Sequence, residues 1–459
     1  MNKSITEKTI YWLDRYKFYL LGVVYILLFF SHLYHDLIVT VRDSMNFMGS
    51  LFTGKLATFY EDFGVLYSFP IYLIMGIWNL PLYLLRLIGI DPLTNTLLLH
   101  WSKLQLVATL VLTLYLMKRI ADLIGMDKKT TEWCIFLTAS SCLVMSPILI
   151  QTQYDIITVT FMMIALNCYF KNKMWGFLIC FALAGTIKGF SLIVFIPLLL
   201  LHEKRILHIL WKLIVVVTPS FVLSTLFPIT PEAQNLALIM FMLPFRWEIP
   251  TSVLPSSVFF ILTFILWFYC YQKKPLEGIK KYSVPLYTCF AAMGGFITVV
   301  YVHPYWAILA APFLYLALFL SVKRFRIVLL LESVFTISMT ALFQYVFHWC
   351  NNFNTIAPTF LPRILRNIPD EMLQRSPRYY LERFVSSSNI TIINYVISSA
   401  MVASFILLLW FLYPKENNDV SANKDTIAEQ MPLLLGRTIV SVFICLVPVA
   451  IYLAWVVFR

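Results

Sequence analysis

The chain is poor in charge for its length. Asp, Glu, Lys and Arg make up 13% of its 459 residues, while hydrophobic residues make up 60%. A soluble globular domain carries about twice that charged fraction. Strand-like alternation of apolar and polar residues is also lacking, whereas apolar runs of about 17–25 residues recur, each long enough to cross a ~30 Å hydrocarbon core as a helix. We therefore expect an all-α, polytopic membrane protein.

Several motifs of soluble enzymes are missing as well. The sequence contains no Walker phosphate loop, no glycine-rich dinucleotide fingerprint and no zinc-protease helix motif. It also lacks a DxD-type acidic motif for a nucleotide sugar. A nucleotide-bearing donor is therefore not expected, and the energy for any reaction or transport must come from a lipid-linked donor or a gradient.

Neither the cysteines nor the net charge indicates a metal site or a nucleic-acid partner. The eight cysteines lack CxxC spacing and lie mostly in apolar runs, as small core residues do. The net charge of +12 comes from Lys and Arg in short segments between apolar runs, where the positive-inside rule and anionic lipid account for them. We expect membrane lipids as partners and no nucleic acid.

The apolar runs predict a single membrane domain, 1–459, with thirteen spans. The N-terminus is polar and basic and lacks a cleavage signal, so it is predicted to be cytoplasmic, with the first span as an uncleaved anchor. The C-terminus is then outside. The predicted spans are 18–33, 97–117, 131–149, 155–170, 174–187, 190–201, 212–228, 256–272, 283–302, 305–322, 327–348, 391–413 and 435–458.

Two large extracytoplasmic loops follow from this scheme, 34–96 and 349–390, together with a polar cytoplasmic linker at 414–434. Within the first loop, the segment 68–90 is apolar but interrupted by Pro70, Asn79 and Pro81. We interpret it as an interfacial or re-entrant helix rather than a span.

Two carboxylates in the first loop are candidates for acid–base chemistry. Asp36 and Asp43 are seven residues apart and would share one face of a helix. A carboxylate at the membrane edge, beside an acceptor hydroxyl, is suited to act as a general base. The alternative is structural, with Asp36 capping a helix or pairing with Arg42.

A second polar group, Gln153, Tyr154 and Asp155, precedes a long apolar run at a predicted outer helix start. An aromatic ring, a carboxylate and an amide together can hold sugar hydroxyls. Asp155 can equally be a helix cap that gains from the helix dipole.

Cationic and aromatic residues at other outer ends are candidates for phosphate or sugar binding. Lys188 lies at a predicted outer hairpin tip, where an anionic lipid phosphate is a natural partner and snorkelling to the headgroups is the alternative. His303 and Tyr305 begin another inward span, as substrate contacts or as part of an interfacial aromatic belt. Arg246, in a smaller outer loop, offers a further phosphate contact.

Taken in order, these pieces resemble the GT-C superfamily of integral-membrane glycosyltransferases, in particular its prokaryotic mannosyltransferase-like group. The resemblance covers about the first two thirds of the chain. It rests on Asp36 after the first span, Gly54-Lys55, Phe59-Tyr60, Phe69-Pro70-Ile71-Tyr72-Leu73, Gln153-Tyr154-Asp155, Ile187-Lys188-Gly189-Phe190 and His303-Pro304-Tyr305-Trp306. The family typically has Lys-Pro at Lys188-Gly189, and often Gly-Gln-Tyr-Asp at Thr152-Gln153-Tyr154-Asp155.

The resemblance implies an inverting transfer of a monosaccharide from a polyprenyl-phosphate donor to a glycan or glycolipid acceptor on the outer face. The family's loop carboxylate acts as the base, a role that falls on Asp36. It implies a hexosyltransferase of which mannose is the usual sugar, and no cofactor, since the lipid-linked sugar is a substrate. No metal ion is expected, because metal dependence is not typical of enzymes that use polyprenyl monophosphates. We expect a bacterial plasma membrane; in a eukaryote the outer side would be the lumen of the endoplasmic reticulum.

A lipid-sugar flippase or transporter is the rival class. It would also have many spans and buried charges, but it would place those charges near the bilayer midplane and show two similar halves. Here the candidate charges are predicted at outer helix ends beside a large loop, an arrangement that favours an enzyme.

Overall fold

The computed structural model describes residues 3–242, 245, 248–249, 256–300, 302–320, 324–414 and 427–458. The described chain is all-α apart from one two-residue ladder, in which Glu248 pairs with Ser257 and Ile249 with Ser256. Within these residues, five helices are long and apolar enough to cross a membrane, or up to eight if each of three bent helix pairs counts as one span. This confirms an all-α, multi-pass membrane protein. Most of the predicted linker, 415–426, lies outside the described residues.

The chain forms two compact units, each built from separate stretches of sequence. Unit 1 comprises 1–34, 117–152 and 303–459, and unit 2 comprises 35–116 and 153–302. The helix α6 (Thr96–Ile124) contributes residues to both.

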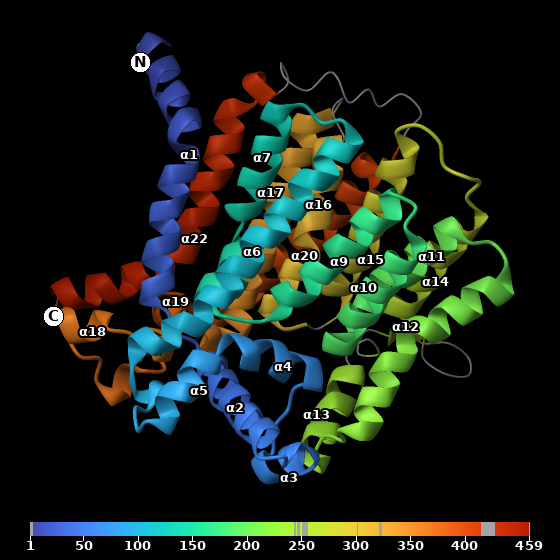
Figure 1. Ribbon diagram of the computed structural model, residues 1–459. Coiled ribbons are helices and arrows are strands. Elements are labelled where there is room, and N and C mark those ends of the chain that lie inside the picture. The colour runs from blue at the N-terminus through green and yellow to red at the C-terminus, as the bar shows by residue number, and fades with distance from the viewer. Residues whose placement is uncertain are drawn as a thin grey trace. The chain divides into compact units, whose positions relative to one another are not determined.

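Unit 2 contains the first predicted loop and most of the short apolar helices. In Figure 1, α9, α10 and α12 lie side by side, and α10 packs against the other two. The elements of this unit, these three included, are α2 (His35–Phe52), η1 (Leu56–Thr58), α3 (Phe59–Phe63), α4 (Phe69–Trp78), α5 (Leu80–Leu87), η2 (Pro92–Thr94), α9 (Asp155–Phe170), α10 (Met174–Ile187), η4 (Gly189–Ser191), α11 (Leu192–His202), α12 (Ile206–Leu226), α13 (Pro231–Met242), β1 (Glu248–Ile249), β2 (Ser256–Ser257), α14 (Val258–Gln272) and α15 (Lys280–Val299).

The apolar segment 68–90 forms two helices, α4 and α5, bent by 69°. Pro81 lies in the first turn of α5. It has no N–H, so it cannot continue the backbone hydrogen-bonding pattern of α4. Asn79 stands at the bend and is fully buried, and its side chain donates to Ser44 Oγ at 2.9 Å. The bend is therefore anchored to α2 by a buried hydrogen bond, as a broken or re-entrant helix requires.

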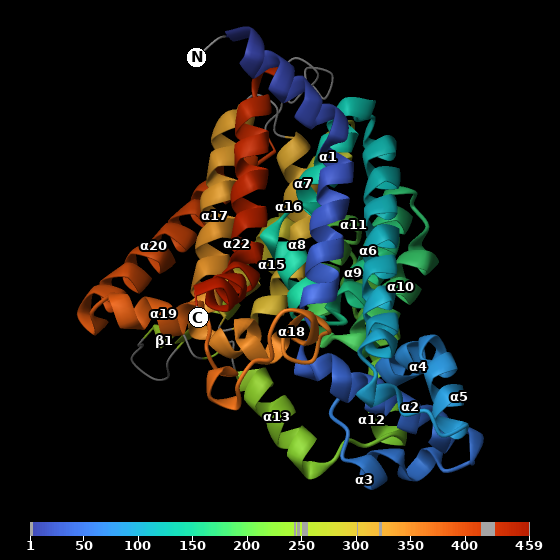
Figure 2. The same cartoon turned by 90° about the vertical axis from the view of Figure 1, so that its left-hand side faces the viewer.

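Unit 1 contains the long C-terminal helices. Figure 2 shows α17 and α22 side by side, and the two are in contact. Its elements are α1 (Lys3–Ser31), α7 (Lys128–Ala139), α8 (Cys142–Met145), η3 (Ser146–Ile150, a π-turn), η6 (Pro304–Leu309), α16 (Ala311–Leu320), α17 (Phe325–Val346), η8 (His348–Asn351), η9 (Phe353–Thr355), α18 (Leu361–Ile364), η10 (Asp370–Met372), α19 (Pro377–Phe384), α20 (Ser387–Leu412) and α22 (Met431–Phe458).

A buried ion pair joins α17 to α22. Arg437 Nη2 lies 2.5 Å and Arg437 Nε 3.1 Å from the two carboxylate oxygens of Glu332. Tyr315 on α16 donates to the same carboxylate at 2.5 Å, and Arg437 Nη1 reaches Ser140 Oγ at 3.4 Å. Glu332 is fully buried and Arg437 nearly so. Two charges in apolar surroundings are tolerable here because each is matched by the other and by further hydrogen bonds.

A second polar contact joins the same two helices at Pro448. Proline has no N–H, so the carbonyl of Ile444, one turn earlier on α22, has no partner within its helix. Gln344 on α17 fills that role, because its Nε2 donates to Ile444 O at 3.2 Å. On α17, Glu332 precedes Gln344, and on α22 their partners Arg437 and Ile444 come in the same order. The two helices therefore run in the same direction.

Arg437→Leu should lower the free energy of unfolding by about 3–5 kcal/mol, because Glu332 is left buried without its counter-charge. The double variant Arg437→Leu, Glu332→Leu should be less damaging than this single variant, because no charge then stays buried. Thermal unfolding of the purified variants in detergent would measure both. A double variant with an unfolding temperature below that of Arg437→Leu would contradict this account.

Candidate active site

Asp36 lies in the first turn of α2, where the positive end of the helix dipole favours a carboxylate. The helix is held by an apolar stripe at helical spacing, Leu37, Val41, Met45 and Met48, all buried. Asp36 is only partly buried. The helix is thus fixed by its apolar side while the carboxylate stays within reach of a substrate.

Aromatic side chains tie this helix to the rest of the first loop. Phe47 packs edge-on against Phe59 at 5.3 Å between ring centroids, and Phe59 packs in the same way against Tyr72. Tyr60 donates its hydroxyl to Tyr67 O at 2.9 Å, and the Tyr67 N–H donates to the hydroxyl of Tyr72 at 3.1 Å. The predicted loop is therefore a packed structure that can hold Asp36 in a defined position.

Gln153 meets Asp36 directly, although the two are 117 residues apart in the chain. Gln153 Nε2 donates to Asp36 Oδ2 at 2.8 Å. Burial raises the pKa of the Asp36 carboxyl above its ordinary value of 3.8, and the hydrogen bond from Gln153 opposes that rise. Lys188 is close enough to lower the same pKa through its charge. A carboxylate with a raised pKa accepts a proton more readily than an ordinary aspartate.

Lys188 and Asp155 form an ion pair beside this carboxylate. Lys188 Nζ lies 3.3 Å from Asp155 Oδ1, and the Asp155 side chain is fully buried while that of Lys188 is 16% exposed. The ammonium also lies 4.8 Å from the centroid of the Tyr154 ring, in a cation–π contact. Five of the residues singled out from the sequence are therefore brought together: Asp36, Gln153, Tyr154, Asp155 and Lys188.

Asp43 lies two turns along α2 and already has a partner. Arg42 Nε donates to Asp43 Oδ1 at 2.8 Å, and the Asp43 side chain is 4% exposed while that of Arg42 is 49% exposed. Burial raises the pKa of the Asp43 carboxyl, and Arg42 opposes the rise. The cation of this pair, rather than its carboxylate, faces solvent.

Tyr67 is a member of the cluster that the sequence did not single out. Its ring packs edge-on against Tyr154 at 4.9 Å between centroids. Burial raises the pKa of the Tyr67 hydroxyl, and the charges of Asp36, Asp155 and Asp43 raise it further. A neutral phenol among three carboxylates can donate hydrogen bonds. The only local sign in the sequence was an aromatic residue before the apolar segment 68–90.

Three further residues were predicted to bind substrate: His303, Tyr305 and Arg246. His303 and Tyr305 belong to unit 1, at the start of η6, where their rings stack at 5.1 Å and Trp306 and Phe347 pack around His303. Arg246 lies outside the described residues.

The local backbone at both departures from the family pattern suits the residue that the pattern has there. Thr152, where relatives of that family often have glycine, has a φ of 49°, in the left-handed region that favours glycine. Lys188 is extended (φ −143°, ψ 113°), the conformation preferred by a residue before proline, and Gly189 begins the 3₁₀ turn η4. The positions therefore suit the residues that the family prefers, although this chain has others.

Comparison of the chain with protein-family models, with curated proteins and with solved structures gave no match in any of the three.

Gly189→Pro should be accepted at the hairpin tip and should stabilise the protein by about 0.5–1 kcal/mol, because proline restricts the unfolded chain. Within the described part of the chain the Gly189 N–H donates no backbone hydrogen bond, and a Cβ built there meets nothing within 4 Å. Thermal unfolding would measure the change, with Gly189→Ala as the control that adds a side chain without the ring. A fall in the unfolding temperature on Gly189→Pro would show that the backbone at Gly189 differs from that described.

Proposed function

We propose that the chain is a GT-C-like glycosyltransferase that moves a monosaccharide from a polyprenyl-phosphate donor to a hydroxyl of a glycan or glycolipid acceptor, with inversion at the anomeric carbon. The observation that carries the proposal is the cluster itself. A carboxylate with a raised pKa, hydrogen-bonded to Gln153, lies near a cation that Asp155 and Tyr154 hold in place. This is the pairing of base and anion-binding group that such a transfer needs.

Asp36 is the proposed base. As the acceptor hydroxyl attacks the anomeric carbon, its proton passes to a carboxylate oxygen of Asp36 and a new C–O bond forms. The bond between the anomeric carbon and the phosphate oxygen breaks, and the polyprenyl phosphate leaves with the bonding electrons. Gln153 holds Asp36 Oδ2 throughout, so Oδ1 is the oxygen available to the acceptor.

Lys188 is the proposed ligand for the leaving phosphate. A lysine ammonium has three donors, so it can keep Asp155 and still bind a phosphate oxygen. Asp155 is fully buried, and its proposed contribution to substrate binding is to position Lys188. Tyr154 and Tyr67 supply aromatic surface and hydroxyls next to the ammonium, where a sugar would lie.

The finer topology is part of the same proposal: thirteen spans, a cytoplasmic N-terminus and a bacterial plasma membrane, with the cluster on the extracytoplasmic side. The shared direction of α17 and α22 supports the order of the last three spans, because α17, α20 and α22 can then be three consecutive crossings in alternating directions.

Asp36→Asn should reduce transfer from a polyprenyl-phosphate sugar by about 10²–10⁴-fold, because the amide cannot take up the acceptor proton. The reaction is measured with purified protein and radiolabelled donor, and formation of a glycosyl product separates an enzyme from a flippase. Asp62→Asn, an exposed carboxylate of α3 in the same loop, is the matched control and should retain full activity. Near-normal transfer by Asp36→Asn would remove Asp36 as the base.

The acid limb of the pH profile offers a second test. Only ionised Asp36 can accept a proton, so kcat/KM should fall as the pH drops through its pKa, which burial places above 3.8. Gln153→Leu removes a hydrogen bond that favours the carboxylate, raises that pKa further and should move the acid limb to higher pH. An unchanged limb in this variant would mean that another group controls it.

A further inference from the structure

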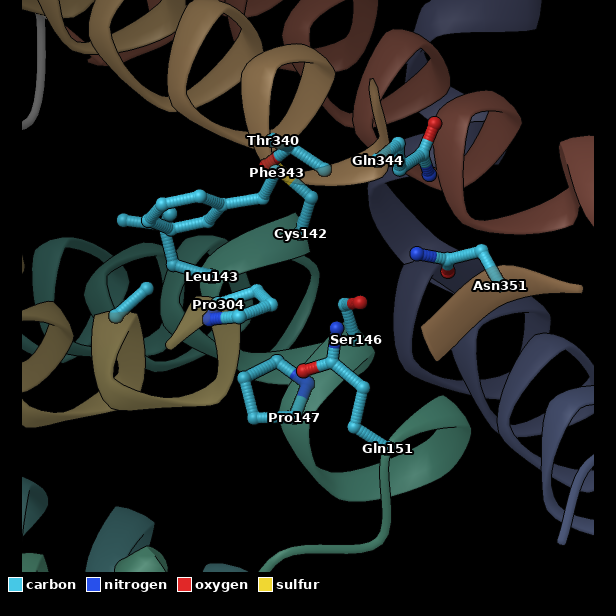
Figure 3. Close-up of a pocket in the computed structure, with 11 residues that line it drawn as sticks. Cys142, Leu143, Ser146, Pro147, Gln151, Pro304, Thr340, Phe343, Gln344 and Asn351 are labelled. Carbon is cyan, nitrogen blue, oxygen red and sulfur yellow. The ribbon is translucent and has the colours of Figure 1, made fainter. Parts of the chain in front are cut away.

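A small cavity in unit 1, with polar side chains in part of its wall, has no part in the proposed reaction. Five segments enclose it: α8, the π-turn η3, η6, α17 and η8. Its lining consists of Cys142, Leu143, Ser146, Pro147, Gln151, Pro304, Ala307, Thr340, Phe343, Gln344 and Asn351. Figure 3 shows the Gln151 amide beside the Ser146 hydroxyl on one side of the space, and the Asn351 amide, from another segment, on the other side.

Two amides in this lining are buried without the partners that amides need. Gln151 is 2% exposed and Asn351 1% exposed. Gln151 Oε1 and both polar atoms of the Asn351 side chain lack a hydrogen-bond partner within the described part of the chain. An amide atom that is left without a partner in the interior is costly. The third amide, Gln344, donates to Ile444 O, so the deficit is confined to the other two.

The backbone around Gln151 also indicates a ligand site. The Gln151 N–H donates to Ser146 O at 2.9 Å, which closes the π-turn, and Pro147 lies in the first turn. A π-turn inserts an extra residue into a helix and occurs often where a side chain serves a ligand. Here the turn brings Ser146 and Gln151 onto the cavity wall together.

The chemistry of the wall restricts the ligand. Among the described residues that line the cavity none carries a charge, so the site has nothing to neutralise an ion. The unpaired atoms include two acceptors and one donor, which a hydroxyl group can serve because it both donates and accepts. The cavity, about 10 Å³ in volume, has room for one group of that size.

We propose that this cavity is a binding site for a single hydroxyl group, which donates to Gln151 Oε1 or Asn351 Oδ1 and accepts from Asn351 Nδ2. The hydroxyl belongs either to an ordered water molecule or to the hydroxymethyl arm of a sugar or polyol. The site is independent of the Asp36 cluster and stands whether or not the protein transfers sugars.

The test uses the full-length protein in lipid nanodiscs. A cryo-EM map without added polyol, at a resolution that shows ordered water, should contain a density peak within hydrogen-bond distance of Gln151 Oε1 and the Asn351 amide if water is the occupant. Thermal unfolding with methyl α-mannopyranoside covers the other source. If the sugar arm binds, the unfolding temperature should rise by about 1–2 °C in the wild type.

Two variants make the result specific. Asn351→Leu should lose the peak or the thermal shift, because it removes a donor and an acceptor from the cavity. Thr340→Val is the matched control in the same wall and should keep the effect, because the Thr340 hydroxyl is already engaged within the protein, between Thr336 O and Cys142 Sγ. A wild-type map without the peak, together with no thermal shift from the mannoside, would overturn the proposal. So would a direct hydrogen bond between Gln151 and Asn351.

Discussion

The geometry of the candidate site depends on the ion pair between Asp155 and Lys188. A lone buried carboxylate at the start of α9 would be costly, and so would a lone ammonium among the apolar helices α10 and α11. Pairing them at 3.3 Å offsets part of both costs and fixes the hairpin tip against the start of α9. Gln153 and Tyr154 directly precede Asp155, so the same pair sets where the amide and the ring face. The position of Gln153 in turn sets the hydrogen bond to Asp36.

Much of this arrangement follows from local sequence. Asp36, Gln153, Asp155 and Lys188 were singled out because each polar residue stands at the end of an apolar run, and the structure does place them at or beside helix ends. Residues at helix ends on the same side of a helix bundle are close in space. A polar residue at the end of an apolar run can therefore be expected near other such residues. The sequence did not show that Lys188 would pair with Asp155, since that pairing depends on how α9 and α10 pack.

Other features could not be predicted because their partners are distant in the chain. Glu332 and Arg437 are 105 residues apart, so nothing local to either charge shows which residue is its partner. The predicted span 131–149 is broken between α7 and α8, where Ser140 and Ser141 replace apolar residues and Ser141 caps the next turn. Counting hydropathy over a window of span length averages over such polar interruptions. Tyr67 was missed for the related reason that its environment comes from three separate segments.

The two polar contacts between α17 and α22 have a consequence for motion. One helix could slide along the other only by breaking the Glu332 pair and by withdrawing Gln344 from the carbonyl that Pro448 leaves bare. Packed apolar side chains can shift past one another in small steps. Two polar contacts at different positions along the helices cannot both be replaced by new ones in a single step. These two helices are therefore expected to move as one rigid body, and any opening or closing of unit 1 must take place in its other elements.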